Sequence, residues 1–502
     1  MTRYCAVQIG GMYVKKHKYR QSERFDFMAF IGRKKERDIL KNCYESGESE
    51  FVAVYGRRRV GKTFLVKELF GSNFTFYSTG ILNGNKEAQL GAWNNEMRRV
   101  GGSDFTVADN WFTAFNNLNL LIEKIRSEQM NTSKKVIFLD EVPWMATMHS
   151  DFLPALDHFW NRWASSCKDV LLIICGSAAS WITDKIINSK GGFHNRLTRQ
   201  LLIEPFTLQE CEQYIKSRMI PMTRYQIAEA YMIFGGIPYY LSLLQSQYSL
   251  YQNVDEMYFS RGAELSNEFE NLYRSLFKNT ENYIHVVETL ARKGSGLTRT
   301  EISTGANITD GGSLTRILKD LSISGFIREY KAYGQKKRDS LYQLTDFFSL
   351  FDIRFRDKRE EYSSDFWLRF SSTSARSIWS GFSFEKLCLQ HLPQVRKKLG
   401  ISGVLTSVFS WRGKTEESGA QVDLVIDRND NVINLCELKF STGEYQIDKK
   451  YYESLRNKKT TFLNSTRTHK AVQTTMITTF GLKRNDYSAE IVSEVVLDDL
   501  FE

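Results

Sequence analysis

One eight-residue stretch combines the residue types that bind phosphate: Gly56, Arg57, Arg58, Arg59, Val60, Gly61, Lys62 and Thr63. Its glycines allow backbone N–H groups to close around phosphate oxygens. Lys62 can reach the β and γ phosphates of a nucleotide, and the Thr63 hydroxyl can ligate Mg²⁺. An apolar strand-like run, residues 51–55, precedes the stretch, and a helical pattern, residues 64–69, follows it. The sequence therefore predicts a phosphate-binding P-loop between a strand and a helix.

Two carboxylates, Asp140 and Glu141, follow the apolar run of residues 136–139. A continuous apolar run is typical of a parallel strand that is buried on both faces, and ligands bind at the carboxyl edge of such sheets. There Asp140 can hold Mg²⁺ through water, and Glu141 can orient and deprotonate an attacking water. Many ordinary strands also end in acidic residues. Downstream of a P-loop, however, this pair predicts a nucleotide hydrolysis site.

The next apolar run, residues 170–175, leads to Ser177. Ser177 can sense the γ phosphate or, equally well, cap the helix that follows. Further along, Arg196 and Arg199 follow two glycines. Either arginine could offset the charge that develops on a transferred phosphoryl group, with a slight preference for Arg196, or both could be solvated surface residues.

Two turns are candidates for contact with the nucleotide base. Ile31, Gly32 and Arg33 precede an amphipathic helix just ahead of the P-loop strand. They are well placed to touch adenine, although an ordinary capping turn fits equally well. The second turn, residues 235–238, interrupts a helical region and ends in Pro238. Pro238 can present a rigid apolar edge to the base, and a plain helix break is the alternative.

The composition is that of a soluble globular protein of about three domains. The chain has 502 residues, of which 42% are hydrophobic and 25% charged, and a net charge of +10 that permits an anionic partner such as nucleic acid. Its seven scattered cysteines indicate neither a disulfide framework nor a zinc site. With no secretory leader and no membrane-spanning run, we expect a cytoplasmic protein without membrane contact.

Residues 279–346 predict three helices and a hairpin, the plan of a winged helix-turn-helix. Such a module binds DNA by placing one helix in the major groove and the wing on phosphates. The candidate recognition helix, residues 313–322, exposes Arg316 and Lys319, and the hairpin has a basic tip at residues 334–338. A module that serves only for packing is the alternative.

A second cluster lies near the carboxyl end of the chain. Residues 421–439 predict a hairpin in which Glu437 and Lys439 share one face, because side chains alternate along a strand. Asp423 lies on the neighbouring strand, and Glu385 lies on an upstream helix that can reach the same place. Two carboxylates can hold Mg²⁺ while the lysine stabilises charge during phosphodiester cleavage. A hairpin with incidental surface charges is the alternative.

From about residue 30 onward, the chain resembles a prokaryotic P-loop ATPase family, often called the archaeal-type ATPase family, of the AAA/STAND superclass. The motifs that carry the resemblance are Ile31-Gly32-Arg33, the P-loop, Leu139-Asp-Glu-Val-Pro-Trp144, Gly176-Ser177 and Gly235-Gly-Ile-Pro238. The resemblance implies an α/β fold in which a P-loop NTPase parallel sheet with a helical lid is joined to a winged helix-turn-helix and a C-terminal α/β restriction-endonuclease-like domain of the PD-(D/E)XK type. The expected segments are an extension (1–29), ATPase core (30–205), lid (206–278), winged helix (279–346), connector (347–378) and nuclease-like domain (379–502).

The resemblance also implies roles for the residues above, with ATP and Mg²⁺ as cofactors. Asp140 and Glu141 serve the metal and the water, with Thr63 as a metal ligand. The nucleotide-binding set is Ile31, Gly32, Arg33, residues 56–63, Phe64, Ser177 and Pro238. The nuclease-like site is Glu385, Asp423, Glu437 and Lys439.

Three features depart from the family pattern: the lid has no clear sensor-2 arginine, the sensor residue is only a serine, and Val422 replaces the proline before Asp423. Two hypotheses follow. The first is an ATPase whose nucleotide state controls a DNA-interacting, nuclease-like module. The second is a slow nucleotide switch that acts on a protein partner through an inactive nuclease fold. An oligomer is compatible with both.

Overall fold

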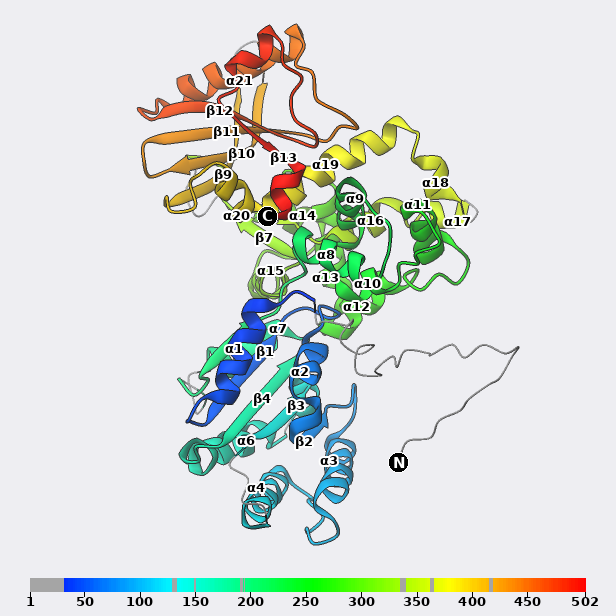
Figure 1. The fold of residues 1–502 in the computed structure, drawn as a ribbon, viewed down its shortest axis with the longest axis vertical. Helices are drawn as coiled ribbons and strands as arrows, with labels where there is room; N and C mark the ends of the chain where they lie inside the picture. The colour runs from blue at the N-terminus through cyan, green and yellow to red at the C-terminus, as the bar shows by residue number, and fades with distance from the viewer. Residues whose placement is uncertain are drawn as a thin grey trace, which may run out of the picture.

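The computed structural model describes residues 31–128, 133–148, 150–189, 193, 195–334, 340–361, 365–414 and 419–502. The extension predicted over residues 1–29, Gly191 and Gly192 ahead of Arg196, and residues 335–338 of the predicted wing tip lie outside the described residues. Figure 1 shows a parallel sheet at one end of an elongated molecule, a second sheet at the other end, and a helical region between them. No described helix is both long and apolar enough to cross a membrane.

The first sheet is entirely parallel, with the strand order β2-β3-β4-β1-β5. Its strands are β1 (Glu50–Tyr55), β2 (Phe74–Thr79), β3 (Lys135–Asp140), β4 (Val170–Gly176) and β5 (Arg199–Leu202). β3 and β4 are buried along their whole length, as their unbroken apolar runs predict. β4 lies between β1 and β3, so the carboxyl ends of all three strands meet at one edge of the sheet.

Helices cover both faces of this sheet, and each face has its own core. One face packs against α1 (Lys34–Glu45) and α2 (Lys62–Phe70). The opposite face packs against α3 (Lys86–Gly101), α4 (Trp111–Glu128) and α6 (Phe152–Arg162). The fully buried members of this second core all come from residues 51–193. Short helical turns complete this part of the chain: η1 (Gly71–Asn73), α5 (Val142–Met145), η2 (Ala164–Ser166), α7 (Ala179–Ile182) and η3 (Thr183–Ile187).

A helical region follows β5. It contains α8 (Leu208–Ser217), α9 (Arg224–Phe234), α10 (Pro238–Ser242), α11 (Leu250–Val254), η4 (Asp255–Phe259) and α12 (Glu268–Leu276). Capping boxes begin α8, α9 and α11, where a side chain at the N-cap and one three residues later satisfy each other's free backbone N–H groups. Local sequence therefore fixes where these helices start.

Residues 280–344 form helices and a small antiparallel sheet in the order that the sequence predicts. They are α13 (Thr280–Ala291), β6 (Leu297–Thr298), α14 (Arg299–Gly305), α15 (Gly312–Ile323), β7 (Ile327–Tyr330) and β8 (Leu341–Leu344). The candidate recognition helix α15 packs against α7, and Lys319 Nζ lies 2.6 Å from Asp184 Oδ1. Arg316 is 79% exposed. Lys319, one of the two basic residues expected to face DNA, is therefore paired with Asp184 of η3.

The remainder of the chain forms a helical connection and a mixed sheet. The helices are α16 (Phe347–Phe355), α17 (Lys358–Glu361), α18 (Phe366–Phe370), α19 (Ser374–Gln390) and α20 (Leu392–Lys398). The sheet order is β13-β12-β11-β10-β9, from β9 (Thr406–Lys414), β10 (Gly419–Arg428), β11 (Val432–Lys439), β12 (Ala471–Thr478) and β13 (Ser493–Val496). α21 (Lys449–Thr466) connects β11 to its parallel neighbour β12, and η6 (Asp486–Glu490) and η7 (Leu497–Phe501) follow.

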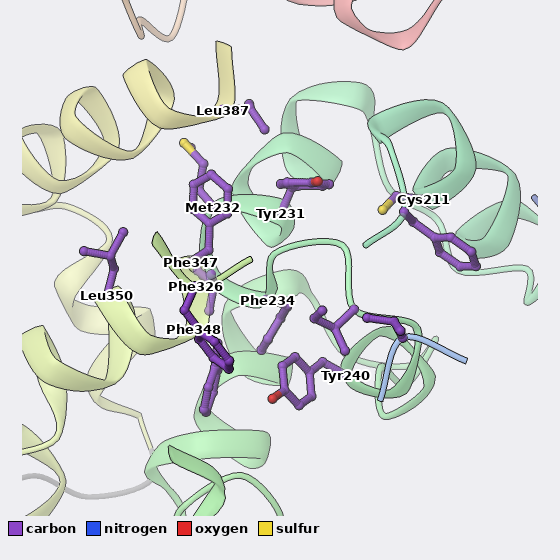
Figure 2. Close-up of a cluster of buried hydrophobic side chains, with 14 of the residues drawn as sticks. Cys211, Tyr231, Met232, Phe234, Tyr240, Phe326, Phe347, Phe348, Leu350 and Leu387 are labelled. Atoms are coloured by element: carbon purple, nitrogen blue, oxygen red, sulfur yellow. The ribbon is translucent and has the colours of Figure 1, made fainter. Parts of the chain in front are cut away.

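A single hydrophobic core joins the two ends of the molecule. It contains Leu40 of α1, the buried residues of the middle helices, and Phe501 near the carboxyl end of the chain. Figure 2 shows its centre, where Phe234 and Tyr240 lie beside Phe348. Tyr240 and Phe348 have ring centroids 4.9 Å apart. The parallel sheet and the C-terminal sheet are therefore connected through packed side chains.

Candidate functional site

The loop between β1 and α2 has a backbone that only glycine adopts easily at two positions. Gly56 has φ +142°, and a Cβ there would lie 2.3 Å from the carbonyl oxygen of Ile203. Gly61 has φ +90°. The ammonium of Lys62 is buried and donates to the carbonyl oxygen of Arg57 at 2.8 Å. The loop therefore closes around its own lysine.

Thr63 and Asp140 meet at the carboxyl edge of the sheet. The Thr63 hydroxyl donates to Asp140, with 2.9 Å between Oγ1 and Oδ2. One side chain comes from the first turn of α2 and the other from the last residue of β3. Hydroxyl and carboxylate oxygens are the donors that Mg²⁺ prefers, so these two residues fit the metal that a nucleotide would bring.

Glu141 adjoins this pair and is fixed by Ser177 at the end of β4. Its backbone is left-handed, with φ +48°, and both the N–H and the hydroxyl of Ser177 donate to Glu141 Oε2, at 3.0 and 2.9 Å. Burial raises the pKa of Glu141, while Lys62 and the Ser177 hydrogen bonds oppose that rise. Ser177 does not cap α7, because the N-cap of α7 is Ala178. The capping alternative for Ser177 is therefore wrong, and its hydroxyl orients Glu141.

The turn at residues 31–33 holds the P-loop from outside. Arg33 is buried, and its Nη2 donates to the carbonyl oxygen of Val60 at 3.1 Å. The Arg33 backbone N–H donates to Glu210 Oε1 at 2.7 Å, and a Cβ on Gly32 would lie 2.7 Å from the same oxygen. Ile31 and Gly32 are half-buried. Arg33 thus contacts the loop backbone from the turn that was predicted to lie near adenine.

The turn at residues 235–238 meets the first turn through Phe206. The Phe206 N–H donates to the Gly236 carbonyl at 2.8 Å, and the Arg33 guanidinium lies 4.9 Å from the centroid of the Phe206 ring. Pro238 starts α10 and is half-buried. Both candidate base-binding turns therefore lie on the same side of the P-loop, with Phe206 between them.

Two of the three loop arginines form ion pairs with residues outside the P-loop. Arg57 Nη1 lies 2.6 Å from Asp346 Oδ1, and Arg59 Nη2 lies 2.9 Å from Glu268 Oε2. The Arg59 guanidinium also lies 4.0 Å from the Tyr239 ring centroid. In this structure the guanidinium groups of both arginines are therefore paired with carboxylates from later parts of the chain. Sequence reasoning missed these contacts, because Arg57 and Asp346 are 289 residues apart.

Arg196 and Phe64 are the predicted site residues that the structure leaves exposed. Arg196 precedes β5, whose first residue, Arg199, pairs with Val52. The P-loop follows the other end of β1, so Arg196 lies at the opposite edge of the sheet. Phe64 follows Thr63 on α2 and is 62% exposed. The structure therefore does not bring Arg196 to the P-loop of its own chain, and its role as an arginine finger stays a prediction.

The four predicted residues of the C-terminal cluster do come together. Leu424 pairs with Cys436 in the antiparallel ladder of β10 and β11, which places Asp423 opposite Glu437. Burial raises the pKa of Glu385, on α19, to about 7, and the charges of Asp423, Lys439 and Glu437 also act on it. Glu385 is therefore close to the charged ends of both strands.

Two further residues of this cluster come from α21. Lys458 Nζ lies 2.7 Å from Glu437 Oε1, and the Tyr451 hydroxyl donates to Glu437 Oε2 at 3.1 Å. The Lys439 ammonium lies 4.6 Å from the Tyr451 ring centroid. Sequence reasoning missed Tyr451 and Lys458, although their spacing of seven residues places both on one helix face.

The acidic residues of this cluster lie beside lysine ammonium groups. Within the described ranges, no three His, Cys, Asp or Glu side chains are arranged to hold a metal ion. Lys458 supplies the positive charge beside Glu437 instead. A divalent cation that bound Glu437 would therefore compete with this ion pair.

Comparison with known proteins identifies the first part of the chain. Residues 30–244 match a family model described as an ATPase domain predominantly from Archaea. Residues 30–244 form an archaeal-type ATPase domain. The P-loop, Asp140, Glu141 and Ser177 all lie inside this ATPase domain, which binds ATP. The matched region also includes both turns beside Phe206.

Relatives of the ATPase domain and of the longer chain occur in archaea. A protein of Methanocaldococcus jannaschii, MJECL04, is 23% identical over 443 residues, which cover 86% of this chain and 91% of the relative. The ATP-binding protein MJ0423 of the same organism is 36% identical over 44 residues, or 9% of this chain and 75% of its own.

Two solved structures align with about two thirds of the chain. The Walker-type ATPase PABY2304 of Pyrococcus abyssi has a TM-score of 0.46 at 15% identity and covers 68% of this chain and 99% of its own. The ORC2 protein of Aeropyrum pernix has a TM-score of 0.40 at 14% identity and covers 68% of this chain and 95% of its own.

Proposed function

We propose that the ATPase domain hydrolyses ATP in a Mg²⁺-dependent reaction. The observation that carries this proposal is the connected set Thr63, Asp140, Glu141 and Ser177 at one sheet edge. Glu141 would orient the attacking water and accept its proton, while Lys62 would leave Arg57 and offset phosphate charge. Mg²⁺ held by Thr63 and Asp140 would neutralise further phosphate charge.

ATP turnover by purified protein tests this proposal. Lys62→Ala should abolish turnover and weaken ATP binding, whereas Glu141→Gln should keep ATP binding and lower turnover by about 10²-fold or more. Lys67→Ala is the matched control, since Lys67 lies on the same helix and its ammonium lies over the Tyr77 ring, 4.6 Å from the ring centroid. Equal turnover in the wild type and in Lys62→Ala would refute the proposal that this domain hydrolyses ATP.

Arg196 would act as an arginine finger on a neighbouring copy of the chain. It is exposed and lies at the sheet edge opposite its own P-loop. The test is to mix Arg196→Ala protein with Lys62→Ala protein. The first variant keeps an intact P-loop, and the second keeps the arginine that would act on it. Recovered turnover in the mixture supports action between copies; no recovery, or full activity of Arg196→Ala alone, refutes it.

The nucleotide state would control a C-terminal module that interacts with DNA. Two observations support this second step: Glu385, Asp423, Glu437 and Lys439 lie together, and one core joins this unit to the ATPase domain. Residues 280–344 would act as a winged helix within the same module. DNA binding is expected to weaken steeply with salt, because phosphate contacts release counterions. Salt-independent binding, or none, would contradict this proposal.

A slow switch with a catalytically inactive C-terminal fold is the second candidate. The observation that favours it is the Glu437–Lys458 ion pair, which occupies the carboxylate that a nuclease would need for metal. Incubating plasmid DNA with Mg²⁺ or Mn²⁺ separates the two. Cleavage that is lost in both Asp423→Ala and Lys439→Ala supports a nuclease. No cleavage with ATP, ADP or no nucleotide supports the switch, for which a protein partner would be the target.

A further inference from the structure

Arg57 makes two contacts that the P-loop motif does not predict. Its carbonyl oxygen accepts a hydrogen bond from the Lys62 ammonium at 2.8 Å. Its guanidinium forms an ion pair with Asp346, and the two side chains are 5% and 1% exposed. The guanidinium also lies 4.6 Å from the Phe326 ring centroid. One residue therefore contacts both the phosphate-binding lysine and a segment outside the ATPase domain.

Asp346 is the N-cap of α16. Its Oδ2 accepts hydrogen bonds from the N–H and the hydroxyl of Ser349, at 2.9 and 2.5 Å, and its Oδ1 faces Arg57. The Asp346 and Thr345 backbone N–H groups donate to the carbonyl of Phe326. The segment that grips Arg57 is thus also the start of the helix that leads toward α19, the helix that carries Glu385.

Little else holds the guanidinium in place. Arg57 Nε and Nη2 are buried and have no hydrogen-bond partner. The position of the side chain is therefore set by Asp346 and the Phe326 ring. Removing the carboxylate charge leaves a buried cation uncompensated, which lowers stability.

ATP would change the partner of Lys62. A phosphate oxygen is a charged acceptor and binds an ammonium more strongly than a neutral carbonyl does. When the phosphates bind, Lys62 leaves the Arg57 carbonyl, and the backbone at Arg57 loses its buried donor. Any resulting shift at Arg57 acts directly on Asp346, since the two side chains lie 2.6 Å apart.

We propose that Arg57 is a positioning residue that links phosphate occupancy of the P-loop to the Asp346 cap of α16. ATP binding thereby alters the stability of the first turns of α16 and the packing of α16 against the middle helices. This inference rests on nucleotide binding by the ATPase domain and not on DNA cleavage by the C-terminal unit.

Hydrogen-exchange mass spectrometry of the full chain with and without ATP tests the link. In the wild type, ATP should protect residues 56–63 and change exchange over residues 345–355 by about tenfold or more, equivalent to one factor of ten in a local opening constant. Asp346→Asn should keep the helix cap, because Asn caps as well as Asp, but remove the ion pair. In this variant ATP should still protect residues 56–63, and the change over 345–355 should disappear.

Two further variants separate linkage from simple stability. Asp346→Glu restores the charge and should recover part of the ATP-dependent change. Arg354→Gln, on an exposed residue of the same helix, should leave the change intact. If Asp346→Asn fails to fold, Arg57→Lys keeps the charge but loses the planar guanidinium that lies over the Phe326 ring, and it should reduce the same change. The inference is overturned if Asp346→Asn shows the full ATP-dependent change in hydrogen exchange over residues 345–355. It is also overturned if ATP protects residues 56–63 in the wild type but does not change exchange over residues 345–355.

Discussion

At the scale of single residues, the environment of Glu141 suits the proton transfer that we propose for it. Burial favours its neutral form, and Ser177 favours its charged form through two hydrogen bonds. The balance gives a carboxyl whose pKa lies above the usual range, which makes it a better base when it is ionised. The αL backbone at Glu141 directs the side chain toward β4 rather than along the strand.

Ser177→Ala should shift the pH dependence of ATP turnover. The Ser177 hydroxyl lowers the pKa of Glu141, so its removal raises that pKa further. Turnover requires the ionised carboxylate, and the acid limb of the pH–rate profile should therefore move to higher pH. The pH dependence of ATP binding serves as the control and should not move. An unchanged acid limb would contradict the role of Ser177 as the residue that orients Glu141.

Sequence alone predicts Asp140, Glu141 and Lys62 because each lies at a fixed distance from a glycine or at the end of an apolar run. It does not predict the partners of Arg57 and Arg59, because Asp346 and Glu268 follow no local pattern. Those contacts form only when distant segments pack together. The pairing of Glu437 with Lys458 was not predicted for a related reason. Lysines are common on exposed helix faces, so the sequence alone does not distinguish one that pairs with a distant carboxylate.

At the scale of elements, the structure matches the sequence where periodicity is strong. The apolar runs around residues 136–139 and 170–175 form fully buried parallel strands, and β11 is the second strand of the hairpin predicted over residues 421–439. The aromatic segment 347–379 shows no simple period. It forms α16, α17, α18 and the start of α19, with buried rings on more than one side of α16. Burial from several directions removes the polar face that makes a helix recognisable.

The capping box of α8 also contacts the turn at residues 31–33, through Glu210. Glu210 accepts hydrogen bonds from Thr207 within the box and from the Arg33 N–H outside it, whereas within the described part of the chain Gln226 of α9 is bonded to Thr223 of its own box. Glu210→Ala and Gln226→Ala should each lower the free energy of unfolding by about 1 kcal/mol. Only Glu210→Ala should also weaken ATP binding, because Arg33 then holds the Val60 carbonyl less firmly. Isothermal titration with ATP checks this, and equal affinities would contradict it.

His391 joins α20 to the amino end of α8. Its Nε2 accepts from the Leu208 N–H at 3.0 Å, and burial lowers its pKa to about 4. Between this value and the unfolded value near 6.5, only the unfolded chain gains a proton at this site. Stability should therefore fall as the pH drops from 6.5 to 4, by about 3 kcal/mol from this residue. His391→Gln should keep an acceptor and flatten that slope in urea unfolding; an unchanged slope would exclude His391 as its source.

At the scale of the whole molecule, the C-terminal sheet is attached to the helices that follow the parallel sheet. Tyr225 of α9 stacks between Phe440 and Phe480, at 5.0 and 5.5 Å between ring centroids. Arg224 lies beside Asp498 and over the Phe501 ring. The expected division into domains therefore does not correspond to separate cores, since one core contains residues of the parallel sheet and of η7.

Tyr225→Ala should loosen this attachment without unfolding either sheet. Two aromatic pairs of about 0.5–1.5 kcal/mol each are lost, in addition to the buried area. Calorimetry should then show two unfolding transitions in place of one. Tyr487→Ala removes a ring that pairs with Tyr452 inside the C-terminal unit and serves as the control, which should lower stability without splitting the transition. A single transition in Tyr225→Ala would show that the shared core alone is sufficient for cooperativity.

The two cores of the parallel sheet differ in when they can form during synthesis. The core against α3, α4 and α6 takes its buried residues from 51–193. It can therefore form before the residues that follow have been synthesised. The opposite core includes Leu497, Leu500 and Phe501 of η7. The apolar residues that pack against η7 therefore lack those partners until residues 497–501 have been synthesised. Until then the nascent chain exposes an apolar surface to which chaperones can bind, and a chain that stops before Leu497 would leave this core permanently incomplete.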